Sequence, residues 1–88
     1  MPLIRREINV KNPQGLHARP AALFVQIVSK YDSVVTIQGN GEKVNGKSIM
    51  GILTLGAQKG ADVVIEVDGE DAQIVADELE ALLTDEEK

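Results

Sequence analysis

The sequence predicts an α+β fold in which helices cover one face of a sheet. Patterns typical of strands and helices follow one another in the order β-α-β-β-α-β-α. Each strand pattern has one apolar face and each long helix pattern has one apolar stripe, so the fold needs two layers. The connections are short, which favours antiparallel pairing. With 88 residues and no Cys, we expect residues 1–88 to form a single domain that packing alone stabilises.

A strand, a turn and a helix are predicted at the start of the chain. Residues 4–11 alternate between apolar and polar side chains, although Arg6 interrupts the apolar face. The Asn-Pro-Gln-Gly cluster at residues 12–15 is typical of a turn. Residues 18–30 have helical composition, and Pro20 falls in the first turn of that helix, where proline is tolerated.

A β-hairpin and a short helix are predicted in the middle of the chain. Residues 34–38 have the β-branched content of a strand, and the Gly-Asn-Gly turn at residues 39–41 leads into a second strand at residues 42–45. Residues 47–55 suit a helix of one or two turns, because glycines on either side limit its length.

The last strand and the last helix have the clearest patterns. Residues 62–68 alternate as a strand does. A stripe with helical spacing follows and predicts an amphipathic helix whose inward face is Ala72, Val75, Ala76, Leu79, Leu82 and Leu83. We expect the tail at residues 85–88 to be frayed.

Composition and charge exclude several classes of function. The formal net charge is −5 and there are only two aromatic residues, so binding to nucleic acid or anionic lipid is not expected. The longest apolar run, residues 21–25, is far shorter than the roughly 20 residues of a membrane span, and there is no signal-peptide pattern. The sequence therefore predicts a cytoplasmic protein with no membrane insertion.

Charge is also distributed unevenly along the chain. Residues 1–61 contain eight basic and three acidic side chains, whereas residues 62–88 contain one basic and eleven acidic side chains. A solvated acidic helix explains this as well as a surface sorted by charge, with a basic face turned to an acidic partner.

His17, the only histidine, lies where a phosphate could be held. The free N–H groups at a helix start carry partial positive charge, and the guanidinium of Arg19 matches phosphate oxygens. A neutral imidazole nitrogen can attack phosphorus. Alternatively, His17 caps the helix and Arg19 is a solvated charge. A metal site is not expected, because a lone His without Cys leaves only carboxylates as further ligands.

Two motifs carry a resemblance to a known family. The segment Gly-Leu-His-Ala-Arg-Pro-Ala at residues 15–21 resembles the active-site signature of HPr, the histidine-containing phosphocarrier of the bacterial phosphoenolpyruvate-dependent sugar phosphotransferase system (PTS). The segment Lys-Ser-Ile-Met-Gly at residues 47–51 resembles the regulatory-serine signature of the same family. The resemblance covers essentially the whole chain. It implies an open-faced β-sandwich, a four-stranded antiparallel sheet with three helices on one face.

The resemblance also implies roles for residues and partners. His17 would accept a phosphoryl group from phospho-Enzyme I and pass it to the IIA component of a sugar permease. Arg19 would hold the phosphate together with the backbone amides of Ala18 and Arg19. The protein would be a covalent carrier rather than a stand-alone catalyst, would need no cofactor, and would work as a monomer.

A shallow docking patch beside His17 is expected, because a relay must dock and release repeatedly. Leu23 is singled out because its position on the helix turns it toward solvent, while Leu53 could equally belong to the core. The expected members are Leu16, Ala22, Leu23, Lys47, Ile49, Met50 and Leu53.

Ser48 has two compatible roles. It is predicted to cap the short helix. By resemblance, it is also the site that HPr kinase/phosphorylase phosphorylates in lineages encoding that enzyme. The protein phosphorylated on this serine then acts as a corepressor for a catabolite-control transcription factor. A nitrogen-branch HPr paralogue and a small effector-binding module without covalent chemistry are the competing hypotheses.

Overall fold

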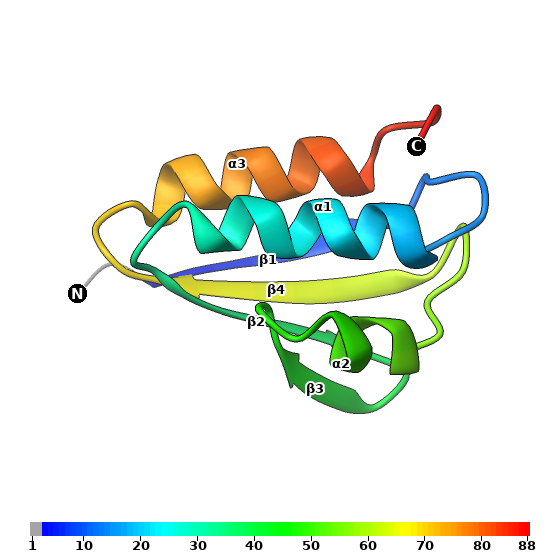
Figure 1. The fold of residues 1–88 in the computed structure, drawn as a ribbon, viewed down its shortest axis with the longest axis horizontal. Helices are drawn as coiled ribbons and strands as arrows, with labels where there is room; N and C mark the ends of the chain where they lie inside the picture. The colour runs from blue at the N-terminus through cyan, green and yellow to red at the C-terminus, as the bar shows by residue number, and fades with distance from the viewer. Residues whose placement is uncertain (1–2) are drawn as a thin grey trace.

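The computed structural model describes residues 3–88 and contains the seven predicted elements in the predicted order. Four strands and three helices follow one another in the order β-α-β-β-α-β-α (Figure 1). Their bounds are β1 (Leu3–Asn9), α1 (Ala18–Ser29), β2 (Val34–Gly39), β3 (Glu42–Asn45), α2 (Ile49–Thr54), β4 (Asp62–Asp68) and α3 (Ala72–Leu83).

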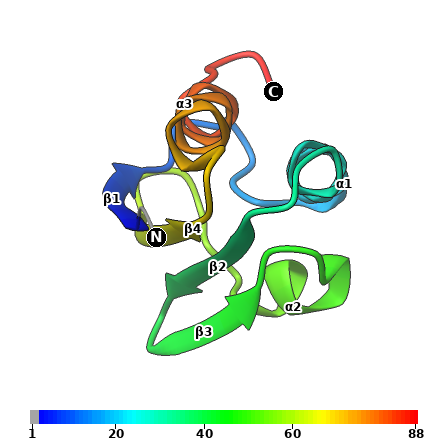
Figure 2. The same ribbon diagram turned by 90° about the vertical axis from the view of Figure 1, so that its left-hand side faces the viewer.

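The strands form one antiparallel sheet in the order β1-β4-β2-β3. Viewed along the strands, all three helices lie on the same side of this sheet, with α3 over β1 and β4, and α2 beside β3 (Figure 2). The other face of the sheet is open. The predicted α+β class and open-faced sandwich are therefore confirmed.

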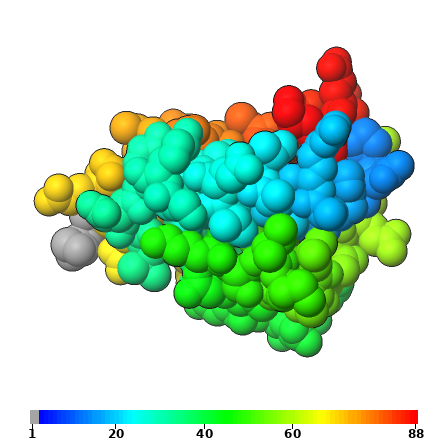
Figure 3. Space-filling view, in the orientation of Figure 1, coloured from blue at the N-terminus to red at the C-terminus, as the bar shows by residue number. Residues whose placement is uncertain are grey.

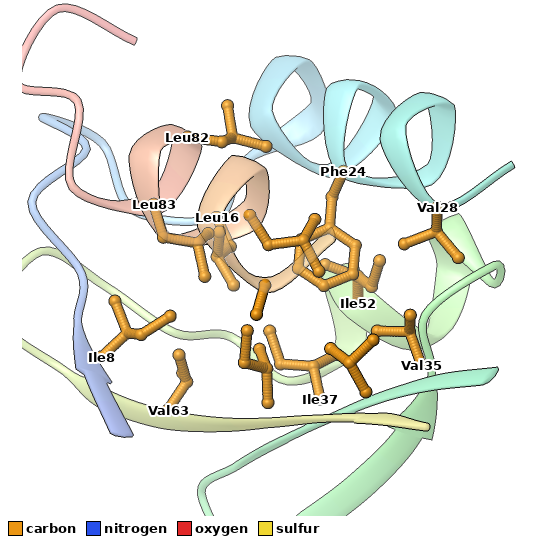
Figure 4. Close-up of a cluster of buried hydrophobic side chains, with 14 of the residues drawn as sticks. Ile8, Leu16, Phe24, Val28, Val35, Ile37, Ile52, Val63, Leu82 and Leu83 are labelled. Atoms are coloured by element: carbon orange, nitrogen blue, oxygen red, sulfur yellow. The ribbon is translucent and has the colours of Figure 1, made fainter. Parts of the chain in front are cut away.

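The core lies between the sheet and the helices. The alternation in β4 places Val63, Ile65 and Val67 inward, where they are fully buried. Phe24 of α1 and Leu79 of α3 are also fully buried against this layer (Figure 4). Each such side chain contributes about 1.5–3 kcal/mol by leaving water, so these inward stripes position the helices.

Arg6 interrupts the apolar inward face of β1, and its side chain extends to the helix α3 that lies over this strand. Its guanidinium forms ion pairs with the carboxylates of Asp77, at 2.8 Å, and Glu80, at 2.9 Å. An inward charge on an edge strand is tolerated when it is paired in this way. The same hydrogen bond from Arg6 lowers the pKa of Asp77.

Two predicted elements differ from the structure by more than one residue at an end. The first strand stops at Asn9, because the Val10 N–H donates to the oxygen of Ala61 at 2.8 Å and the Lys11 N–H donates to the oxygen of Leu83 at 2.9 Å. The short helix spans Ile49–Thr54 rather than residues 47–55, since Ser48 caps it. Among residues 3–88, no helix is long and apolar enough to cross a membrane.

Candidate phosphate-accepting site

The turn before α1 pushes His17 to the surface. Gly15 adopts a left-handed φ of +69°, and a Cβ there would lie 2.4 Å from the Ala57 oxygen. Leu16 then donates its N–H to that same oxygen at 2.8 Å, and its side chain is buried in the core (Figure 4). The buried residue anchors the loop, so the next residue, His17, emerges half-exposed at the start of α1.

The start of α1 offers two backbone donors beside His17. The first hydrogen bond within the helix runs from the Ala21 N–H to the His17 oxygen at 3.0 Å. The N–H groups before Ala21 have no acceptor within a helix, and Pro20 has no N–H. The amides of Ala18 and Arg19 therefore have no hydrogen-bond partner within α1. His17 occupies the N-cap position of α1, but its side chain makes no capping hydrogen bond, so the alternative that it only caps or abuts the helix holds for its position and not for its imidazole.

A small cavity of about 250 Å³ opens beside the imidazole. His17 and Arg19 line it together with the turn before α1 and the last residues of the chain, Glu87 and Lys88. The main-chain oxygen of Lys88 lies 3.4 Å from Nε2 of His17. His17 and Arg19 thus line one space at the start of α1.

The tail is folded back instead of frayed, which corrects the prediction for residues 85–88. The Asp85 carboxylate accepts the Glu87 N–H at 2.8 Å and pairs with the Lys88 ammonium at 3.1 Å. Figure 3 shows this last segment beside the loop that leads into α1. Sequence reasoning missed these residues, because their contacts with the loop depend on how α3 is docked.

Intramolecular ion pairs explain much of the uneven charge along the chain. Arg5, Arg6, Lys30 and Lys43, all from the basic part, pair with carboxylates of the acidic part. Glu78 on α3 accepts hydrogen bonds from the Tyr31 hydroxyl and from Lys30, and these lower its pKa.

Two basic side chains, one in each motif, form no ion pair within the described part of the chain. Within residues 3–88, Arg19 and Lys47 take part in no ion pair. Both side chains are exposed. Several basic residues elsewhere in the described chain are paired within the fold, whereas Arg19 on α1 and Lys47, just before the N-cap of α2, are not.

Ser48 is the N-cap of α2. Its hydroxyl oxygen accepts the N–H of Gly51 at 3.0 Å, and its backbone is extended, as a cap requires. The predicted capping role is confirmed. The side chain is half-exposed, so the same hydroxyl lies at the surface of the helix start.

The residues expected to form the docking patch differ widely in exposure. Met50 is 67% exposed and Ile49 is 38% exposed, while Ala22 and Leu53 are half-buried. Helices α1 and α2 pack against each other and form one continuous surface (Figure 3). Leu16 is a correction: it is 4% exposed and belongs to the core, because the bond to Ala57 draws it inward.

Leu23 was expected to point into solvent, and this is also corrected. It is half-buried, packs against the core and lines a groove of about 360 Å³ between α1 and α3. Helical spacing alone placed it outside the inward stripe of α1. The neighbouring α3, with Ala81 and Leu82 on the other wall of the groove, covers that flank.

The described residues provide no site for a metal ion. Nowhere in residues 3–88 do three or more His, Cys, Asp or Glu side chains gather closely enough to hold one.

Comparison with known proteins places this geometry in context. Residues 4–85 match a family model described as the PTS HPr component phosphorylation site. The chain is 39% identical over 84 residues to the HPr-like protein Crh of Bacillus subtilis (strain 168), covering 96% of this chain and 99% of that protein.

Solved structures show the same fold. A crystal structure of the phosphocarrier protein HPr from Bacillus anthracis str. Ames is similar with a TM-score of 0.88 at 36% identity, over 94% of this chain and 99% of that one. A crystal structure of Bacillus subtilis Crh, described as an intertwined dimer with a swapping domain, has a TM-score of 0.74 at 39% identity, over 97% and 98% of the two chains.

Proposed function

The chain belongs to the HPr phosphocarrier family of the phosphotransferase system, and on that premise we propose that it carries a phosphoryl group on His17. The observation that carries the proposal is the half-exposed imidazole beside Arg19 and the two helix-end amides. The donor in this proposal is phospho-Enzyme I, itself charged by phosphoenolpyruvate. The acceptor is the IIA component of a sugar permease.

The transfer needs only groups that this chain supplies. An unprotonated imidazole nitrogen of His17 attacks phosphorus, a nitrogen–phosphorus bond forms, and the bond between phosphorus and Enzyme I breaks with its electron pair returning to Enzyme I. The amides of Ala18 and Arg19 and the Arg19 guanidinium stabilise the charge on the phosphoryl oxygens. Transfer to the IIA component is the same step with the chain as donor.

Docking of both partners is assigned to the surface that α1 and α2 share. Met50 and Ile49 supply exposed apolar area, and methionine adapts to more than one partner surface. Lys47 and Arg19 add the charge that attracts an acidic partner. This combination suits an interface that forms and dissociates repeatedly. We place the relay in the cytoplasm and propose that residues 1–88 work as one monomeric unit.

Ser48 is proposed as a regulatory phosphorylation site for HPr kinase/phosphorylase. Its hydroxyl is half-exposed at a helix start, where the helix dipole accommodates a phosphate. The phosphate would add about −1.5 to −2 charges next to Met50 and Lys47. Phosphorylation at Ser48 would therefore weaken Enzyme I docking and favour a catabolite-control transcription factor as partner.

A second candidate is a purely regulatory role without phosphoryl relay. It is favoured by one observation, the 39% identity to Crh, which is named for catabolite repression. The relay is favoured by His17, a nucleophile that lies next to the two helix-end amides and the Arg19 side chain. Service in the nitrogen branch of the system is a further form of the relay, with a different Enzyme I.

One experiment separates these candidates. The protein is incubated either with Enzyme I and phosphoenolpyruvate or with HPr kinase/phosphorylase and ATP, and its intact mass is measured. A phosphoryl group added only by the first pair supports the relay alone, and one added only by the second supports the regulatory role alone. Addition by neither pair, including the nitrogen-branch Enzyme I, contradicts both.

A further inference from the structure

Asn12 is a fully buried polar side chain in the loop between β1 and α1. Its amide nitrogen donates to the main-chain oxygens of Leu82, at 2.9 Å, and Asp85, at 3.1 Å. Both acceptors lie at the end of α3 or just beyond it, 70 and 73 positions along the chain from Asn12. One side chain therefore joins the start of the His17 loop to the end of the last helix.

The same residue shapes the turn that leads to His17. The Asn12 main-chain oxygen accepts the N–H of Gly15 at 2.9 Å, which closes the turn just before Leu16. From Asp85 the contacts continue along the tail to Lys88, whose main-chain oxygen lies 3.4 Å from Nε2 of His17. These contacts form a closed circuit that begins in the loop and returns to the imidazole.

We propose that Asn12 is a positioning residue for His17, acting through the tail. By holding the Asp85 carbonyl, it keeps the Lys88 main-chain oxygen opposite Nε2. A carbonyl or carboxylate oxygen can only accept, so this placement favours the neutral ring form that carries its proton on Nε2. The other ring nitrogen, Nδ1, then keeps its lone pair and is the nucleophile. The catalytic consequence rests on the function proposed above, whereas the effect on the ring proton does not.

An asparagine is an unfavourable choice for this buried position unless its two donated hydrogen bonds serve a specific role. Among residues 3–88, the Oδ1 atom of Asn12 has no hydrogen-bond partner. An unsatisfied buried oxygen is unfavourable, and an apolar side chain would avoid it. Only a side chain with two donors, however, can bind the Leu82 and Asp85 oxygens at once.

Two substitutions break the circuit at different places. Asn12→Ala removes both donated bonds. Asp85→Ala keeps them but releases the Glu87 N–H and the Lys88 ammonium, and its half-exposed site makes loss of folding unexpected. Glu86→Ala is the matched control, because it removes the same charge from the same tail at an exposed position.

The test measures the ring and the reaction separately. Nitrogen-15 spectra of the neutral imidazole distinguish a proton on Nε2 from one on Nδ1. We expect the Nε2–H form to dominate in the original protein and in Glu86→Ala. In Asn12→Ala and Asp85→Ala, its excess over the Nδ1–H form should fall by at least half. With Enzyme I, we expect kcat to fall several-fold in the same two variants, with KM unchanged because the docking patch is intact.

The outcomes separate this proposal from the proposed function. An unchanged ring spectrum in folded Asn12→Ala overturns the positioning role, and if that variant does not fold, an unchanged spectrum in Asp85→Ala does so. An equal change in Glu86→Ala also overturns it, because the cause is then tail charge. A changed spectrum in a protein that Enzyme I never labels supports the positioning role and contradicts only the relay.

Discussion

The N–H of Leu16 donates a 2.8 Å hydrogen bond to the main-chain oxygen of Ala57. This bond fixes the residue before His17 against the segment between α2 and β4. It leaves no room for a side chain at the preceding position, where a Cβ would lie 2.4 Å from the same oxygen. The exposure of His17 thus depends on close backbone packing immediately before it.

Gly15→Ala is expected to lower the free energy of unfolding by ~1–3 kcal/mol, because the left-handed backbone becomes strained and the new methyl group meets Ala57. Urea denaturation measures this loss. Gly60→Ala is the matched control: its φ is +91°, but nothing lies within 4 Å of an added Cβ, so only the backbone term remains. Equal losses in the two variants would contradict the packing role of Gly15.

Arg19→Ala is expected to reduce the rate of phosphoryl transfer by about 10²-fold, the usual effect of removing one donor from a charge-stabilising site. The side chain is exposed, so the free energy of unfolding should stay within about 0.5 kcal/mol of its original value. Arg19→Lys keeps the charge but loses the planar guanidinium group, so its transfer rate should lie between those of the original protein and Arg19→Ala. Rapid-quench kinetics with Enzyme I measure the rates, and an unchanged rate in Arg19→Ala removes this residue from the site.

Two substitutions at Ser48 separate its capping role from its charge. Ser48→Ala should cost about 1 kcal/mol of stability, because the Gly51 N–H loses its acceptor. Ser48→Asp keeps a capping oxygen and should retain stability, yet it should raise the Kd for Enzyme I several-fold, with a smaller effect at high salt. Calorimetric titration measures the affinity. Equal Kd values for the original protein and Ser48→Asp would contradict the electrostatic argument.

Met50→Ala should weaken Enzyme I binding by roughly tenfold, the factor that corresponds to ~1.4 kcal/mol. Met50 is the most exposed apolar residue of the docking patch. Ile74→Ala is the matched control, since Ile74 is 54% exposed on α3, outside the patch. The same titration should show no change for that variant, and similar effects of the two substitutions would exclude α1 and α2 as the specific docking surface.

Periodicity was sufficient to predict the elements of the fold but not the environment of each site residue. The stripe of α3 and the alternation of β4 were clear in the sequence, because their inward residues are all apolar. Leu16 was placed wrongly because a single apolar residue in a loop has no periodic pattern. Its burial depends on Ala57, 41 positions later by residue number.

The tail and Asn12 were missed for a related reason. Asn12 belongs to a cluster typical of turns, and the sequence gives no sign that its amide reaches the oxygen of Leu82, 70 positions away. The acidic tail is typical of a frayed end. Only the docking of α3 on the sheet brings Asp85 and Lys88 next to the His17 loop.

The most direct test of the central claim is the site of labelling by Enzyme I and labelled phosphoenolpyruvate. We predict one acid-labile phosphoryl group in the original protein and in Ser48→Ala, and none in His17→Ala, whose folding circular dichroism would verify. Acid lability distinguishes phosphohistidine from a serine ester. Label retained in folded His17→Ala, or absent from the original protein under conditions in which a known HPr is labelled, would contradict the account.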